Sequence, residues 1–145
     1  MNPTTKTILL ALLALAIASE ASAQSATTFY NSSGQSIGRA TTSGNTTTFR
    51  DSVGRTTHRA VTNGNTTTNY DAGGRVFSRE TTTANTTTTF RDSSGRTTGR
   101  AATNGNTTTT YDASGKIISR ESTSGNTTTI YDAGGRNFGR FTTNR

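Results

Sequence analysis

The sequence predicts an all-β protein: an antiparallel β-hairpin repeat meander of about twelve short strands that curls or closes like a barrel. Three observations point to this fold class. A unit of about 20 residues recurs six times, each unit is rich in threonine and carries two kinds of turn, and no apolar stripe with a 3.6-residue period is present. β-Branched and aromatic residues favour strands, whereas threonine and glycine are poor helix formers.

Residues 1–23 have the layout of a secretory signal peptide. Lys6 provides a short positive region, residues 8–18 are apolar, and residues 21–23 (Ala-Ser-Ala) form a small-residue cleavage site. The apolar run is too short for a comfortable membrane-spanning helix. We therefore expect a cleaved leader, no membrane span after cleavage, and a protein that is secreted, either periplasmic or extracellular.

Residues 24–145 are expected to form a six-copy repeat domain with few apolar side chains. All leucines, the methionine and the proline lie in the leader, and the chain has no cysteine. Disulfides, thiolate metal sites and a cysteine nucleophile are thereby excluded. So few apolar residues place the composition near that of disordered chains, but the regular period argues for an ordered array.

Each repeat contains two turns of different chemistry. An Asp-x-x-Gly segment fits a type I turn followed by a left-handed glycine, and an Asn-Gly or Ser-Gly pair such as Asn63-Gly64 fits a two-residue hairpin turn. The structural residues of the first turn are predicted to be Asp51, Gly54, Asp71, Gly74, Asp92, Gly95, Asp112, Gly115, Asp132 and Gly135.

These turns predict a strand register. With Tyr70 opposite Val76 and Val61 opposite Thr66, equivalent positions change sheet face from one repeat to the next. A 40-residue superperiod in the sequence agrees with this, and a three-residue loop at residues 83–85 absorbs the single 21-residue step. The register places on one face Tyr30, Phe49, Val61, Tyr70, Val76, Phe90, Tyr111, Ile117, Ile130 and Phe138, and on the other Arg50, Arg91, Phe29, Ile37, Phe77, Ile118, Tyr131 and Phe141.

A β-solenoid with one repeat per coil is the alternative fold. It would stack equivalent arginines about 4.8 Å apart, where they repel, whereas a meander separates them by about 10 Å. A meander also sets Asp opposite Arg or Lys across each turn, as in the pairs 51–55, 112–116 and 132–136. We therefore favour the meander.

The stretch from Gly64 to Arg75, GNTTTNYDAGGR, resembles the YD repeat, in which glycine is followed after a few residues by Tyr-Asp-x-x-Gly-Arg. Residues 125–136 match as well, and residues 105–116 match with Lys for Arg, while the second and fourth repeats carry Arg-Asp in place of Tyr-Asp. YD repeats occur in Rhs-type toxins and teneurins. The resemblance implies β-hairpin architecture and an extracellular bacterial setting, but no activity.

The sequence gives no sign of an enzyme or of a cofactor. His58 is the only histidine, at a position that we interpret as a variable exposed strand site. Each aspartate is explained by its role in its own turn. The spacing of the carboxylates brings no two of them together, so the sequence offers no pair of groups for acid–base catalysis.

Binding has more support, because the chain carries a formal net charge of +7 with arginines spaced regularly among aromatic residues. Such rows can hold phosphate, sulfate or uronate groups and stack on sugar rings. Secretion favours an anionic glycan or cell surface over nucleic acid. The candidate ligand-binding residues are Arg50, Arg59, Arg79, Arg91, Arg100, Arg120, Tyr70, Tyr111 and Tyr131.

The predicted function is a structural or adhesive role at a cell surface or outside the cell, without enzymatic activity. The main alternative is binding of anionic polysaccharide or lipopolysaccharide through the Arg and aromatic rows. Two further alternatives are an ice-binding threonine array and a curli-like fibre that self-associates through sheet edges.

Overall fold

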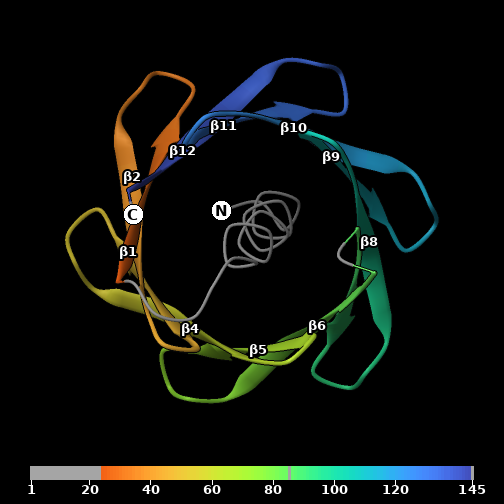
Figure 1. The fold of residues 1–145 in the computed structure, drawn as a ribbon. Helices are drawn as coiled ribbons and strands as arrows, with labels where there is room; N and C mark the ends of the chain where they lie inside the picture. The colour runs from red at the N-terminus through yellow and green to blue at the C-terminus, as the bar shows by residue number, and fades with distance from the viewer. Residues whose placement is uncertain (1–23, 85, 145) are drawn as a thin grey trace.

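The computed structural model describes residues 24–84 and 86–144, which form a closed barrel of twelve antiparallel strands (Figure 1). The predicted signal peptide lies outside the described residues. No helix in the described part of the chain is long and apolar enough to cross a membrane. The strands are β1 (Ser25–Asn31), β2 (Ser36–Ser43), β3 (Thr46–Asp51), β4 (Thr56–Asn63), β5 (Thr66–Asp71), β6 (Val76–Thr83), β7 (Thr87–Asp92), β8 (Thr97–Asn104), β9 (Thr107–Asp112), β10 (Ile117–Ser124), β11 (Thr127–Asp132) and β12 (Asn137–Asn144).

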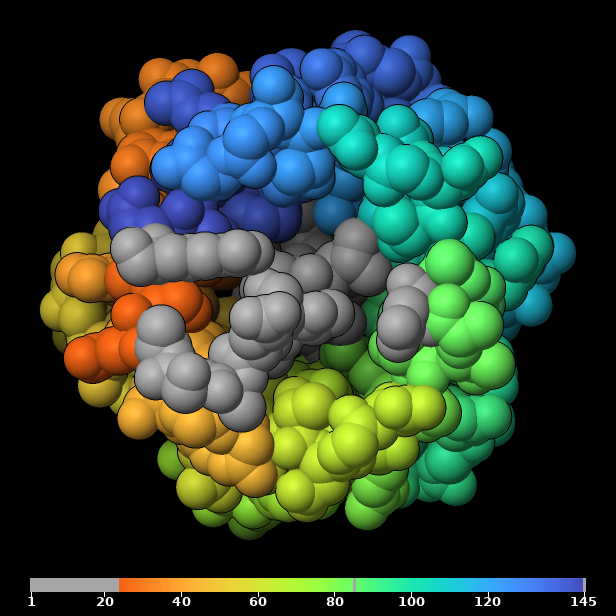
Figure 2. Space-filling view, viewed as in Figure 1, coloured from red at the N-terminus to blue at the C-terminus, as the bar shows by residue number. Residues whose placement is uncertain are grey.

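The predicted hairpin meander is confirmed, and it closes. Every strand pairs with its neighbours in the chain, and β1 pairs with β12 from Ala26↔Asn144 to Asn31↔Gly139. Figure 2 shows successive hairpins packed side by side around the wall. The solenoid alternative is wrong, because all of the pairings are antiparallel. Closure leaves no unpaired edge among the described strands, so the edge-pairing fibre has no template there.

The Asp-x-x-Gly turns form as predicted. In one of them, the Gly74 amide donates to the Asp71 carbonyl at 3.0 Å, the Asp71 amide donates to the Arg75 carbonyl at 2.9 Å, and Gly74 has φ +81°. The Asp71 carboxylate also accepts from the Arg75 amide at 2.9 Å. Aspartate closes the loop and glycine supplies the left-handed residue. In Figure 1 these loops flare outward from the ring of strands.

The second turn lies one residue later than predicted. Asn63 pairs with Thr66, so the two turn residues are Gly64 and Asn65, not Asn63 and Gly64. Gly64 has φ +55°, and no asparagine in the described chain has positive φ. This is the pattern of a type II′ turn, which puts glycine at the first central position, whereas the predicted type I′ turn needs positive φ at both.

The turn between β6 and β7 has three residues, as predicted, but it lies one residue later than the predicted residues 83–85. Thr83 pairs with Thr87, which leaves residues 84–86 between them. Ala84 takes the glycine position with φ +52°. The extra residue is therefore confined to the turn, and the strands on either side keep their phase.

A β-bulge in every Asp-turn hairpin overturns the predicted face assignment. Tyr70 pairs with Val76 as expected, but Asn69 pairs with Ser78, so Phe77 is an extra residue on β6. The same shift occurs between β1 and β2, β3 and β4, β7 and β8, β9 and β10, and β11 and β12. One added residue per repeat cancels the predicted change of face, because side chains alternate with a period of two.

Equivalent positions therefore face the same side in all six repeats. Phe49 and Tyr70, which we expected on one face, are separated: phenylalanine points inward and tyrosine outward. The inward set holds Phe29, Phe49, Phe90, Ile130 and Phe141, with Phe138 packed against it. The outward set holds Tyr30, Tyr70, Tyr111, Tyr131, Arg50 and Arg91, which precede the turn aspartates or asparagine.

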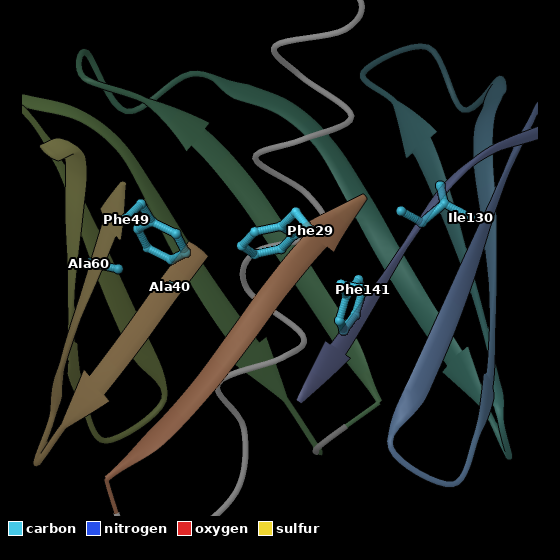
Figure 3. Packing of buried hydrophobic residues seen from close by; sticks show 6 residues of the cluster. All are labelled: Phe29, Ala40, Phe49, Ala60, Ile130 and Phe141. Carbon is cyan, nitrogen blue, oxygen red and sulfur yellow. The ribbon is translucent and has the colours of Figure 1, made fainter. Parts of the chain in front are cut away.

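Two kinds of contact line the barrel interior. The larger apolar cluster points into the barrel and consists of Phe29, Phe49, Ile130 and Phe141 with two alanines (Figure 3). Six Thr–Thr hydrogen bonds of 2.9–3.0 Å link neighbouring strands near the Gly-Asn turns: Thr27–Thr143, Thr42–Thr47, Thr62–Thr67, Thr82–Thr88, Thr103–Thr108 and Thr123–Thr128.

Large and small inward residues alternate around the wall. Phe29 faces Gly38, Phe90 faces Gly99 and Ile130 faces Gly139 in the strand register. A Cβ at these glycines would lie 2.4–2.6 Å from a backbone carbonyl oxygen of the next strand. Bulky inward side chains are thus matched with positions where the strands approach too closely for a side chain.

Candidate functional site

The charged residues of the described chain separate into three zones. The five aspartates and the five cations that follow them lie at the flared loops, and the two glutamates lie inside the barrel. Eight arginines occupy outward positions in the middle of the strands. We call these eight the arginine belt: Arg39, Arg50, Arg59, Arg79, Arg91, Arg100, Arg120 and Arg140. In the loops the cations are matched in number by the aspartates, so the excess positive charge of the described chain lies in the belt.

Local sequence explains why the belt is continuous. Each belt arginine on an even-numbered strand lies next to a buried residue, as Arg59 does to Ala60 and Arg100 to Ala101. Because alternate residues face opposite sides, a buried neighbour fixes arginine on the outside. The 20-residue period then repeats the arrangement on every second strand, about 10 Å further round the wall.

Three belt arginines cover a tyrosine. The guanidinium carbon of Arg59 lies 4.9 Å from the ring centre of Tyr70, and Arg100 lies 4.3 Å from Tyr111. Arg140 covers Tyr30 at 4.8 Å across the closing β1–β12 pair. These cation–π contacts hold the guanidinium groups over the tyrosine rings. Arg120 is directly opposite Tyr131 in the same register.

Two hairpins present arginine opposite arginine. Arg39 on β2 pairs with Arg50 on β3, and Arg79 on β6 pairs with Arg91 on β7. Like charges in directly opposed positions are destabilising. None of the four forms an ion pair with an acidic side chain of the described residues. An open surface depression beside the first pair is lined by both arginines together with Gln24, Thr41 and Asp51.

In two of the flared loops, by contrast, the aspartate forms an ion pair with the arginine of the same loop. Asp92 binds Arg96 at 3.0 Å and Asp132 binds Arg136 at 2.9 Å. The hydroxyl of Ser94, together with hydrogen bonds from Arg96, lowers the pKa of Asp92 to about 2. Backbone and side-chain hydrogen bonds from Arg136 likewise lower the pKa of Asp132. These carboxylates are committed to their own loops.

His58 does not occupy the exposed site that we expected. The bulge turns it inward, where its ring stacks on Phe49 with centroids 4.1 Å apart and meets Phe77 edge-on at 6.0 Å. Burial lowers its pKa to about 4, so the ring is neutral at pH 7. No group of three or more metal-ligating side chains is found in residues 24–84 and 86–144.

The structure brings the nine predicted ligand-binding residues to one outer surface but divides their roles. Tyr70 and Tyr111 support arginines, whereas Arg50, Arg79 and Arg91 stand in the arginine pairs. The predicted set lacks Arg39, which completes the first pair. Its membership of the same 20-residue series is the signal that would have included it.

Comparison with known proteins adds no family to this picture. No family model matches the chain, and no curated protein is similar enough to count as a relative.

Proposed function

We propose that this protein acts outside the cell as a non-enzymatic adhesive protein that binds anionic polysaccharide through the arginine belt. The observation that carries the proposal is the pairing of Arg39 with Arg50 and of Arg79 with Arg91, without an acidic partner in the described chain. Bringing two guanidinium groups together costs free energy in the unbound protein, and a sulfate, phosphate or carboxylate between them offsets that cost.

The remaining belt residues extend the surface for a polymer. Arg59 and Arg100 are already held over tyrosine rings, so less side-chain freedom is lost when they bind a ligand. A linear polyanion that runs round the wall meets a belt arginine on every second strand, about 10 Å apart. Binding by many weak contacts of this kind suits adhesion.

The ice-binding alternative has less support. It requires a flat threonine array, whereas the barrel wall is curved, and twelve of the threonines form hydrogen-bonded pairs on its inner side.

Retention on immobilised heparin tests the proposal. We expect the protein to bind at low salt and elute as salt rises, because polyanion binding releases counterions. The double variant Arg39→Gln/Arg50→Gln should elute at clearly lower salt and lower the slope of log affinity against log salt by about 2.

The matched control is Arg96→Gln/Arg136→Gln, which removes the same charge from the flared loops. It should elute close to the wild type. Equal losses from both double variants would show that only net charge matters, and that would contradict a belt site. A third variant, Arg39→Lys/Arg50→Lys, keeps the charge but loses the planar fork, and we expect it to bind more weakly than wild type.

A further inference from the structure

The arginine belt is not uniform around the barrel. Each belt arginine on an even-numbered strand is directly opposite one outward residue of the next strand, and β12 is followed by β1. That residue is arginine in the β2–β3 and β6–β7 pairs and tyrosine in the other four. Strands β2 to β7 therefore hold five of the eight belt arginines. We call them the arginine-rich sector: Arg39, Arg50, Arg59, Arg79 and Arg91.

The sector presents three cationic positions in a row. The pair Arg39–Arg50 comes first, Arg59 follows alone, and the pair Arg79–Arg91 comes third. The arginines of β2, β4 and β6 are two strands apart, which is about 10 Å along the wall. Two linked pyranose rings have a similar length. The row therefore matches a sugar chain that carries one anionic group on every second ring.

The carboxylates of these strands are engaged elsewhere. Glu80 is buried inside the barrel. The carboxylates of Asp51, Asp71 and Asp92 each accept a backbone amide of their own loop at 2.9–3.0 Å. In the described part of the chain, no ion pair joins a sector arginine to a carboxylate. An anion that reaches the sector is therefore not displaced by an internal one.

Threonine hydroxyls lie beside the cations on the same outer surface. In the strand register, Thr48 on β3 is directly opposite Arg59, and Thr68 on β5 is directly opposite Arg79. Both threonines are half-buried, and each lies next to a buried residue, so it faces outward. The equivalent residue is threonine in all six repeats. We call these six the outer threonine row: Thr28, Thr48, Thr68, Thr89, Thr109 and Thr129.

The outer threonine row differs from the inner threonines in its hydrogen bonding. The inner threonines donate to one another across neighbouring strands. Within residues 24–84 and 86–144, no hydrogen bond is found for the hydroxyls of the outer row. A hydroxyl both donates and accepts, which suits the hydroxyl groups of an uncharged sugar ring. A polyanion without such groups would use the arginines alone.

We propose that the arginine-rich sector binds a linear acidic polysaccharide with one anionic group on every second sugar, and that Thr48 and Thr68 contact the rings between the anions. The inference rests on the proposed function and narrows it to one side of the barrel and one ligand class. Three cationic positions need three anions. The shortest chain that fills the sector is therefore a hexasaccharide.

End-labelled hyaluronan oligosaccharides test the spacing, because their carboxylates occur on every second ring. Fluorescence anisotropy at fixed low salt would give the affinity for chains of four, six and eight sugars. We expect the affinity to rise about 10-fold or more from four to six sugars, as a third charge-assisted contact forms. From six to eight sugars it should rise by no more than a few-fold. Arg59→Gln/Arg79→Gln should abolish the first step.

The other side of the barrel supplies the matched control for charge. Arg100→Gln/Arg120→Gln removes two belt arginines from β8 and β10, outside the sector, and should leave the step from four to six sugars in place. Equal losses from the two arginine double variants would overturn the sector.

A charge-neutral double variant tests the hydroxyl contacts. Thr48→Val/Thr68→Val should weaken hexasaccharide binding several-fold and leave the binding of linear polyphosphate unchanged. Valine already occupies an outward position at Val61 on β4, so the strands accommodate it. The control, Thr109→Val/Thr129→Val on β9 and β11, should bind the hexasaccharide like wild type. Equal effects of both threonine variants would overturn the role of Thr48 and Thr68.

Failure of this inference is separable from failure of the proposed function. A protein that is retained on heparin but gains nothing from four to six sugars would contradict the spacing and leave the proposed function standing. A protein that heparin does not retain would contradict both.

Discussion

Thr27 on β1 and Thr143 on β12 are hydrogen-bonded through their hydroxyl groups at 3.0 Å, although 116 residues separate them. The five Thr–Thr pairs within consecutive strands have the same geometry at 2.9–3.0 Å. The first and last strands thus meet as two neighbouring strands of the array would. The barrel is a ring of equivalent hairpins, and its closure needs no special element.

Closure makes Phe141 a sensitive position. Its ring lies 5.9 Å from that of Phe29 on the partner strand. Phe141→Ala should destabilise the fold by about 3–5 kcal/mol through the cavity that it leaves, as measured by denaturant unfolding. It should also promote association by weakening the β1–β12 pair, detectable by size-exclusion chromatography. Val53→Ala, at a loop residue that is 71% exposed, is the control and should change little.

Within the part of the chain that the structure describes, Asn69 is the only hydrogen-bond donor found for the Glu80 carboxyl group. Asn69→Ala should lower the free energy of unfolding by about 1–3 kcal/mol, because it leaves Glu80 and Ser78 unsatisfied. Thr110→Asn, at the equivalent position of the β9–β10 hairpin, should have the opposite sign and stabilise the protein, because Ser119 and Glu121 have buried oxygens without a hydrogen-bond partner there. A stabilising effect of Asn69→Ala would show that this network does not contribute as its geometry indicates.

Replacing Gly99 tests how closely β8 and β9 approach each other. A Cβ there would lie 2.4 Å from the Tyr111 carbonyl oxygen, so the backbone has to move in Gly99→Ala. We expect a loss of about 1–3 kcal/mol from overpacking. Ser119→Ala at the equivalent position removes an unpartnered buried hydroxyl and should be neutral or stabilising. Thermal or denaturant unfolding of both variants gives the comparison.

Ala84 occupies a turn position where the other repeats have glycine. Its φ of +52° costs an L-residue about 1 kcal/mol. Ala84→Gly should therefore stabilise the protein by a few tenths to about 1 kcal/mol, since the greater freedom of glycine in the unfolded chain offsets part of the gain. The reverse change at an equivalent turn, Gly105→Ala, should destabilise, and unfolding midpoints would reveal either sign.

The buried glutamates predict an unusual pH dependence. Burial raises the pKa of both Glu80 and Glu121 from 4.5 to about 8. The folded state then binds more protons than the unfolded state between these values, so stability falls as pH rises through that window and levels off above about 8. Each glutamate contributes up to about 1.4 kcal/mol per pH unit.

His58 acts in the opposite direction below pH 6.5, because burial lowers its pKa to about 4. The folded state binds fewer protons there, and the contribution of His58 is lost as pH falls from 6.5 to 4. The window from pH 6.5 to 8 therefore reports the glutamates alone. Denaturant unfolding across it should show falling stability, with about half the slope in Glu121→Gln. A slope unchanged by that substitution would contradict the prediction.

Four features could be predicted without coordinates, because they depend on neighbours within a few residues: the repeat, the strands, the Asp-x-x-Gly turns and the hairpin meander. Asp71 and Gly74 build their turn from their own backbone and side-chain bonds. The same period gave six of the eight belt arginines as a series, but Arg39 and Arg140 were not among the predicted binding residues. The face that each residue takes, and the pairing of β1 with β12, depend instead on contacts between distant parts of the chain.

The physical reason lies in the bulge at Phe77 and its equivalents. No glycine or proline marks that position, since the series runs through Ile37, Thr57, Phe77, Thr98, Ile118 and Phe138. A bulge adds local twist and bend, which suits strands that must curve into a closed wall. One inserted residue moves every later side chain to the other face of the sheet. The bulges that the closed barrel requires therefore place tyrosine outside and phenylalanine inside, and they turn His58 and Glu121 toward the interior.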